Sequence, residues 1–208
     1  MTFILGLTGS IGMGKSATAG FFREAGVPVY DADASVHELY RGEGAPLIEA
    51  AFPGVVHEGV VDRQELGRRV LDDRAALKRL EDIVHPLVRQ AETRFLKDAA
   101  GASAPLAVLD IPLLFETGGE RRCDAVLVVS APAAVQKQRV LARPGMTEER
   151  FAAILAKQMP DSDKRARAHW VVDTSRGFEE ARRGVLGVIR ACSGRPGRVA
   201  AMRLSQSS

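Results

Sequence analysis

The sequence predicts an α/β protein with a parallel β-sheet at its core, and three observations lead to that prediction. An apolar run, Phe3–Leu7, precedes a glycine-rich turn and a helix-forming segment, and it is apolar on both faces, as a buried central strand should be. Two later apolar runs lie at Leu106–Leu109 and Ala125–Val129, and a shorter one follows at Trp170–Val172. Helical segments separate these runs, and strands that alternate with helices form parallel sheets.

The first turn carries the most specific motif in the chain. Residues 9–16 read Gly-Ser-Ile-Gly-Met-Gly-Lys-Ser, which is G-x-x-x-x-G-K-S/T between a strand and a helix. Its glycines let successive backbone N–H groups point at phosphate oxygens, and the helix N-terminus adds a positive dipole end there. Lys15 is expected to reach the β- and γ-phosphates, and the Ser16 hydroxyl to bind Mg²⁺. A glycine-rich turn alone can be purely structural, but the closing Lys-Ser predicts a nucleoside triphosphate site.

The next elements follow in chain order. Residues 15–25 are predicted to form a helix that Gly26 ends, and Val27–Asp31 a short second strand. Residues 34–104 contain no clear strand, and two or three helices there are expected to form an acceptor-binding lobe. Pro86 should begin a new helix or kink one. It interrupts a helical stripe formed by Leu77, Leu80, Val84, Leu87 and Ala91.

Asp33 is the first candidate catalytic residue, because it comes just after the second strand. In a doubly wound sheet this position faces the γ-phosphate, where a carboxylate can orient or deprotonate the attacking hydroxyl. The alternative is that Asp33 caps a helix beginning near Ala34. Asp31 could serve equally well, and the sequence pattern does not separate the two carboxylates.

Three further residues could serve phosphoryl transfer. Asp110 follows the strand Leu106–Leu109 and could hold Mg²⁺, although it could equally cap a turn. Arg139 and Arg143 are four residues apart, so on one helix they would share a face. Over a triphosphate they would neutralise the charge of the transferring group, and otherwise they form a solvated surface. His85 precedes Pro86 and has no metal-ligand spacing.

Bulk properties describe an ordinary globular protein. The 208 residues are 46% hydrophobic and 26% charged, with a formal net charge of +3. Residues 137–168 hold eight basic side chains against four acidic ones, as a phosphate-binding segment would, and residues 143–168 are expected to form a mobile lid. No secretory signal or membrane-spanning run is apparent, and Cys123 and Cys192 read as buried thiols. A cytoplasmic enzyme is therefore expected.

Five segments together resemble one family. They are LTGSIGMGKS at 7–16, VYDAD at 29–33, HPLV at 85–88, DIPLLFE at 110–116 and QKQRVLAR at 136–143. In this order and spacing they are similar to dephospho-coenzyme A kinase, over about residues 3–190. The resemblance implies a three-layer phosphate-loop kinase core with a five-stranded parallel sheet, a helical acceptor lobe and a lid. It divides a kinase domain at 1–194 into core (1–33, 105–142, 169–194), lobe (34–104) and lid (143–168), with a flexible tail at 195–208.

The resemblance also implies a reaction and its site. ATP, with Mg²⁺, would phosphorylate the ribose 3′-hydroxyl of dephospho-coenzyme A, the last step of coenzyme A synthesis. The ATP phosphates would bind Gly12, Met13, Gly14, Lys15, Ser16 and Ala17, and the metal would meet Ser16 and Asp110. Catalysis would rest on Asp33 as the base, with Lys15, Arg139 and Arg143. The acceptor side would hold Thr8, Asp33, His85, Leu114 and Glu116.

The sequence departs from the family pattern at two places. Ser10 and Met13 stand where the family usually has Gly and a small residue, and because backbone N–H groups do the binding there, a side chain that points outward is tolerable. Asp173-Thr174-Ser175 replaces the usual Asp-Asn, which leaves the adenine-binding residues open.

Three other functions are alternatives to this one. A different small-molecule kinase on the same core stays open. The absence of asparagine excludes the N-K-x-D motif of GTPases. A nucleic-acid-dependent ATPase would need the basic tail. We expect a small-molecule acceptor, no nucleic acid or membrane partner, and a monomer or weak homo-oligomer.

Overall fold

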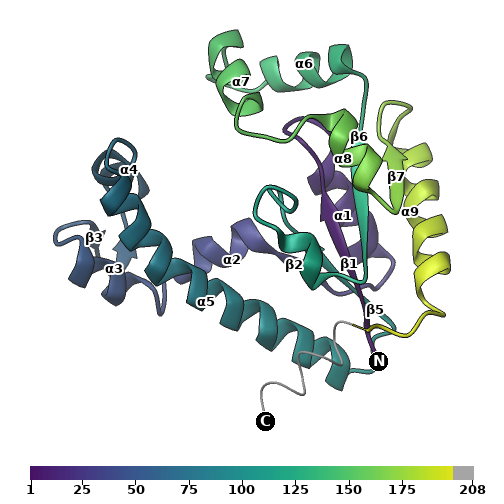
Figure 1. The fold of residues 1–208 in the computed structure, drawn as a ribbon, viewed down its shortest axis with the longest axis horizontal. Helices are drawn as coiled ribbons and strands as arrows, with labels where there is room; N and C mark the ends of the chain where they lie inside the picture. The colour runs from purple at the N-terminus through teal and green to yellow at the C-terminus, as the bar shows by residue number, and fades with distance from the viewer. Residues whose placement is uncertain (199–208) are drawn as a thin grey trace. The chain divides into compact units, whose positions relative to one another are not determined.

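A five-stranded parallel sheet forms the framework of the protein, which confirms the predicted fold class. The computed structural model describes residues 1–198 (Figure 1). The strand order is β2-β5-β1-β6-β7. The strands are β1 (Phe3–Thr8), β2 (Val29–Asp31), β5 (Leu106–Asp110), β6 (Ala125–Ser130) and β7 (Trp170–Asp173). β1 is the central strand, and all of its residues are buried on both faces of the sheet, as the sequence predicts.

The register of the central strands brings their carboxyl ends to one edge. Leu7 of β1 lies beside Asp110 of β5, and Thr8 lies beside Val128 of β6. In open parallel sheets this edge is where ligands bind. The phosphate loop begins here, directly after Thr8.

The chain divides into two compact units. The first comprises Met1–Tyr30 and the chain from Asp98 onward, and the second comprises Asp31–Lys97. Helices of the first unit are α1 (Lys15–Glu24), α6 (Ala133–Leu141), α7 (Glu148–Leu155), α8 (Asp161–Arg167) and α9 (Phe178–Cys192), with a 3₁₀ turn at Gly119–Arg122. Figure 1 shows α9 running alongside β7, and α1 packs against α9 as well.

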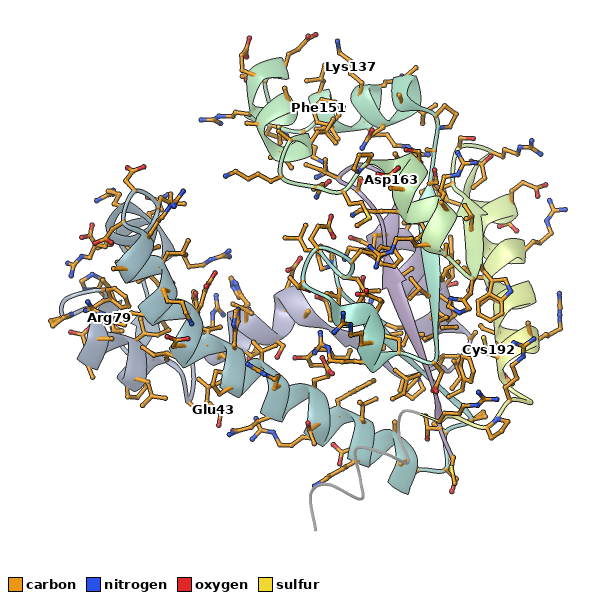
Figure 2. The ribbon with its side chains drawn as sticks, viewed as in Figure 1. Glu43, Arg79, Lys137, Phe151, Asp163 and Cys192 are labelled. Carbon is orange, nitrogen blue, oxygen red and sulfur yellow. The ribbon has the colours of Figure 1, made fainter. Side chains whose placement is uncertain are left out.

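Both cysteines lie inside the first unit as free thiols, as predicted. Cys192, labelled in Figure 2, is fully buried at the end of α9. Burial raises the pKa of its thiol to about 11. Cys123 is also buried, in the segment before β6.

The second unit has an apolar core of its own, built around Ile48, Val55 and Leu66. Its helices are α2 (Ala32–Leu39), α3 (Ala45–Ala51), α4 (Arg63–Val70) and α5 (Arg74–Gly101), the last of which extends into the first unit. The expectation that it contains no strand is wrong, because β3 (Val56–His57) and β4 (Val60–Val61) form a hairpin. Glu58 and Gly59 have φ of 51° and 78°, as a two-residue hairpin turn requires.

Helix α5 passes through Pro86 without a break, so the prediction of a new helix at that residue is wrong. Proline removes one backbone hydrogen bond from a helix, but packing on the apolar face continues across it. Leu80 and Val84 are buried in the core of the second unit, whereas Leu77 at the start of the stripe is 38% exposed.

The ends of some helices and strands differ slightly from the predicted ones. The second strand begins at Val29 rather than Val27, because the Val27 N–H still bonds the Phe22 carbonyl behind the Gly26 turn. Gly26 ends α1 with φ of 76°, as expected. The predicted tail 195–208 lies outside the described residues from 199 onward, and Arg198 N–H donates to Asp124 Oδ1 at 2.7 Å. Within residues 1–198, no helix combines the length and apolarity that a membrane span would need.

Candidate active site

The phosphate loop has the backbone that anion binding requires. Gly12 and Gly14 have φ of 77° and 87°, a region that side chains disfavour. Gly14 is the N-cap of α1 and offers no side-chain acceptor, so no side chain caps the first N–H groups of this ten-residue helix. A Cβ on Gly9 would lie 2.4 Å from Val129 Cγ2, so close packing also demands glycine there. The loop can therefore present backbone N–H groups to phosphate oxygens.

Lys15 and Asp110 form the central ion pair of the site. Lys15 Nζ lies 2.7 Å from Asp110 Oδ1, joining the first residue of α1 to the last residue of β5. The Asp110 side chain is 2% exposed and that of Lys15 is 16% exposed. A carboxylate this deeply buried needs a cation, so the pair holds the Lys15 ammonium at the base of the loop.

Three distant side chains hold the loop from outside, and sequence reasoning missed all of them as binding or supporting groups. Gln136 Nε2 donates to Ile11 O at 2.7 Å, and the Ile11 N–H donates to Gln158 Oε1 at 3.1 Å. Thr174 Oγ1 donates to Met13 O at 2.9 Å. The loop backbone is thus fixed on both its N–H and its carbonyl side before any ligand binds.

The side chains of Ser10 and Met13 are buried and do not point outward, the orientation that the binding of phosphates by backbone N–H groups would tolerate. Met13 is 2% exposed and Ser10 4% exposed. The Met13 sulfur accepts a hydrogen bond from the Ala131 N–H at 3.1 Å, and its side chain belongs to the main apolar core. An unbranched thioether fills an irregular gap between the loop and β6, which a smaller residue would leave empty.

Arg139 and Arg143 do not share a helix face as predicted. Helix α6 ends at Leu141, and Arg143 lies beyond its C-cap. Arg139 donates to Thr174 through both amino groups, at 3.0 Å to Oγ1 and 2.7 Å to the carbonyl. This contradicts the alternative of a solvated Arg139. The Arg143 side chain is exposed and bonds to no other residue in the described part of the chain.

The alternative that Asp33 caps a helix is wrong, because the cap is Asp31. Helix α2 begins at Ala32 rather than near Ala34, and Asp31 Oδ1 accepts from the Ala34 N–H at 3.0 Å. Asp33 lies in the first turn of α2 with an exposed side chain. Its carboxylate has no hydrogen-bond or ionic partner among residues 1–198. The sequence pattern does not separate Asp31 from Asp33. In the structure the two carboxylates have different roles in the helix.

The acceptor-side candidates have unequal exposure. Thr8 and Leu114 are fully buried, and Thr8 Oγ1 donates to Pro112 O at 2.9 Å, which secures the loop after β5. Glu116 follows in the same loop and pairs with the buried Lys164. His85 is exposed on α5, in the second unit. Contact of these residues with an acceptor stays a prediction.

The residues at the start of α1 suit Mg²⁺. Ser16 offers an exposed hydroxyl, and Asp110 offers a carboxylate at the end of β5. The described part of the chain contains no group of three or more His, Cys, Asp or Glu side chains placed to hold a metal. A site with only a few protein oxygen ligands suits Mg²⁺, because this ion takes its remaining ligands from water and substrate phosphates.

Comparisons with known proteins identify the family to which this chain is similar. A family model described as dephospho-CoA kinase matches residues 3–180. A dephospho-CoA kinase of Mesorhizobium japonicum is 62% identical over 194 residues, covering 93% of this chain and 98% of that protein. One of Brucella melitensis is 56% identical and covers 93% and 96%.

Solved structures show the same fold. A Thermus thermophilus protein has a TM-score of 0.80 and 39% identity, covering 91% of this chain and 97% of that one. A dephospho-CoA kinase from Campylobacter jejuni has a TM-score of 0.66 at 22% identity, covering 93% and 99%. With the family model and the curated relatives spanning nearly the whole described chain, the resemblance carried by the five motifs is confirmed: the chain belongs to the dephospho-CoA kinase family.

Proposed function

We propose that this protein transfers the γ-phosphoryl group of ATP to the ribose 3′-hydroxyl of dephospho-CoA, releasing CoA and ADP. Family membership supports the reaction. The observation that carries it is the Lys15–Asp110 pair at the base of an N–H-lined loop, where the carboxyl ends of β1 and β5 meet. Phosphoryl transfer needs mainly positioning and charge neutralisation, and this arrangement can provide both.

On the ATP side, backbone N–H groups from Gly12 to Ala17 would bind phosphate oxygens. The N-terminus of α1 lowers the cost of their negative charge, and Lys15 would leave Asp110 in part to reach the β- and γ-phosphates. The Ser16 hydroxyl, with Asp110, would hold Mg²⁺. When bound, the ion neutralises phosphate charge.

On the acceptor side, Asp33 would accept the proton of the 3′-hydroxyl as that oxygen attacks phosphorus. Because Asp31 takes the capping role, the Asp33 carboxylate is left without a partner among the described residues and is available for a hydroxyl. We propose that four other residues help to bind the rest of the acceptor molecule: Thr8, His85, Leu114 and Glu116. Thr8 and Leu114 would do so by supporting the loop after β5.

The two arginines would act differently. Arg143, exposed and unpaired within residues 1–198, is proposed to contact the transferring phosphoryl group. Arg139 would act chiefly by fixing Thr174, and through it the phosphate loop. We propose that a lid begins at Arg143. Its last segment, α8, packs against β6, so movement is proposed for the part before it.

A coupled assay for ADP release tests the function. We expect ADP release from ATP and Mg²⁺ to depend on added dephospho-CoA, and CoA to appear in equal amount. The rival is another small-molecule kinase, so shikimate, gluconate and nucleosides should be tried in parallel. Turnover with one of these, and none with dephospho-CoA, would refute the proposal.

The molecular setting is proposed along with the reaction. A cytoplasmic enzyme acting on a small molecule needs neither nucleic acid nor a membrane, so truncation after Arg198 should leave kinase activity nearly unchanged. Sedimentation should show a monomer or a weak homo-oligomer.

A further inference from the structure

We propose that Lys164 is a positioning residue for acceptor binding: it holds the Glu116 carboxylate so that one oxygen, Oε2, is presented to a hydrogen-bond donor of dephospho-CoA. This inference rests on the proposed function and adds to it a residue that none of the sequence motifs includes.

Lys164 is buried to an unusual degree. Its side chain on α8 is 0% exposed, and its Nζ lies 2.9 Å from Glu116 Oε1. Lysine is almost never fully buried unless it is paired, and burying an ion pair gains little stability over a well-packed apolar pair. The pair therefore calls for a role beyond packing, and the position of Glu116 in the loop after β5 points to the acceptor.

Only one of the two carboxylate oxygens of Glu116 has partners. The Met159 N–H donates to Oε1 at 2.8 Å, and Lys164 also approaches Oε1. Oε2 is buried and has no partner among the described residues. A buried carboxylate oxygen without a donor is costly, so a donor from outside the described protein is expected to meet it. Dephospho-CoA offers hydroxyl and amide donors of the required kind.

Glu116 can accept such a bond because it is ionised. Burial alone would raise the pKa of this carboxyl group. The Lys164 side chain and the N–H groups of Met159 and Glu116 itself outweigh that effect and hold the pKa below its ordinary value. An ionised carboxylate is an acceptor only, so Oε2 selects for a donor.

A second ion pair on the same helix provides a matched control. Arg167 NH2 lies 2.7 Å from Glu120 Oε1, one helical turn after Lys164, and Glu120 Oε2 is likewise buried and unpaired. Unlike Lys164, Arg167 is 44% exposed and also stacks over the Phe115 ring at 4.6 Å. If the unpaired oxygens of Glu116 and Glu120 merely reflect how α8 packs on this loop, removing either ion pair should have the same effect on KM for dephospho-CoA.

The test is a double-mutant cycle with Lys164→Met, Glu116→Gln and the combination, alongside Arg167→Gln. The measurements are KM for dephospho-CoA, KM for ATP, kcat and the thermal unfolding midpoint. We expect Glu116→Gln to raise KM for dephospho-CoA by about tenfold to a hundredfold, the worth of a hydrogen bond to a charged group. Lys164→Met should raise it by a similar factor, and the double variant should add nothing, since Lys164 acts through Glu116. KM for ATP should stay within about twofold in all variants, and Arg167→Gln should leave both KM values unchanged.

Several results would overturn the inference. They are a wild-type KM in either single variant, effects that multiply in the double variant, or an equal rise of KM in Arg167→Gln. If Lys164→Met alone does not fold because it strands a buried carboxylate, the uncharged double variant still decides, and it must match Glu116→Gln. Failure of the proposed function is recognised separately, because the wild-type protein would then not phosphorylate dephospho-CoA.

Discussion

The phosphate loop and the segment that carries Asp33 differ in how firmly their polar groups are held. Around the loop, Gln136, Gln158 and Thr174 bond its backbone across separations of 125, 147 and 161 residues. At the start of α2, the nearest polar contact is local, the Asp31 cap on Ala34, and Asp33 has no partner among the described residues.

This difference indicates a division of work. The groups proposed to bind ATP are fixed before the ligand arrives, so little ordering entropy is lost when phosphates bind. The group proposed to meet the acceptor hydroxyl is left without a competing bond. Variants of the two regions should therefore fail differently: loop variants through ATP binding and stability, and the Asp33 variant through chemistry alone.

Asp33→Asn should produce the largest loss of rate. Asparagine keeps the shape but cannot accept the hydroxyl proton, so kcat should fall by about 10²–10⁴-fold. The unfolding midpoint and both substrate affinities should be unchanged, because Asp33 supports nothing in the described structure. Asp31→Asn is the matched control. Asparagine caps a helix as well as aspartate does, so that variant should keep both stability and kcat. If Asp33→Asn kept ordinary turnover and Asp31→Asn lost it, Asp31 would be the base and Asp33 would not.

Lys15→Ala should reduce kcat by about 10²–10³-fold, as removal of one preorganised charge from a transition state does. Unlike the Asp33 variant, it should also be less stable, because Asp110 is left buried without its cation. Adding Asp110→Asn should recover part of the unfolding midpoint while kcat stays low. Near-normal turnover in the folded single variant would remove Lys15 from the proposed site.

Arg143→Ala should lower kcat by about tenfold to a hundredfold with little change in KM for ATP, because it loses a charged contact made mainly in the transition state. Arg139→Ala should raise KM for ATP as well, since Thr174 loses both of its guanidinium bonds. Steady-state kinetics on both variants distinguish the two. Identical profiles would mean that the arginines act as one unit.

Thr174→Val should have the smallest effect. It removes the hydroxyl that donates to the Met13 carbonyl and accepts from Arg139, and it keeps the side-chain volume against Gly14. KM for ATP should rise by less than about tenfold, because Arg139 keeps its bond to the Thr174 carbonyl, and kcat should hold. A variant indistinguishable from wild type in ATP binding would show that the loop keeps its shape without this contact.

The sequence predicts what local pattern determines. The apolar run Phe3–Leu7, the glycine spacing and the closing Lys-Ser together specify a strand, a turn and a helix within one short stretch, and the structure confirms all three. The positions of Asp110 at the end of one strand and of Asp33 shortly after another were predictable for the same reason. Which carboxylate caps α2 depends on where the helix begins, and element ends are the least certain part of a sequence prediction.

Features that depend on packing between distant segments were not predictable. Strands β3 and β4 have two residues each, too few to show an alternating pattern. Pro86 is tolerated inside α5 because tertiary packing outweighs its local cost. Gln136, Gln158 and Thr174 hold the loop across long sequence separations that no local pattern reveals, and the Met13 side chain faces inward through its contacts with Ala131 and the main apolar core.

The buried thiol of Cys192 gives the protein a built-in reporter of folding. With a pKa of about 11, only about one thiol in 10⁴ is ionised at neutral pH, and it is the thiolate that attacks an alkylating reagent. Because the side chain is fully buried at the end of α9, modification must await opening of the first unit. The labelling rate of Cys192, followed by mass spectrometry, can therefore tell a variant that has lost only its chemistry from one that opens more often, without any engineered cysteine.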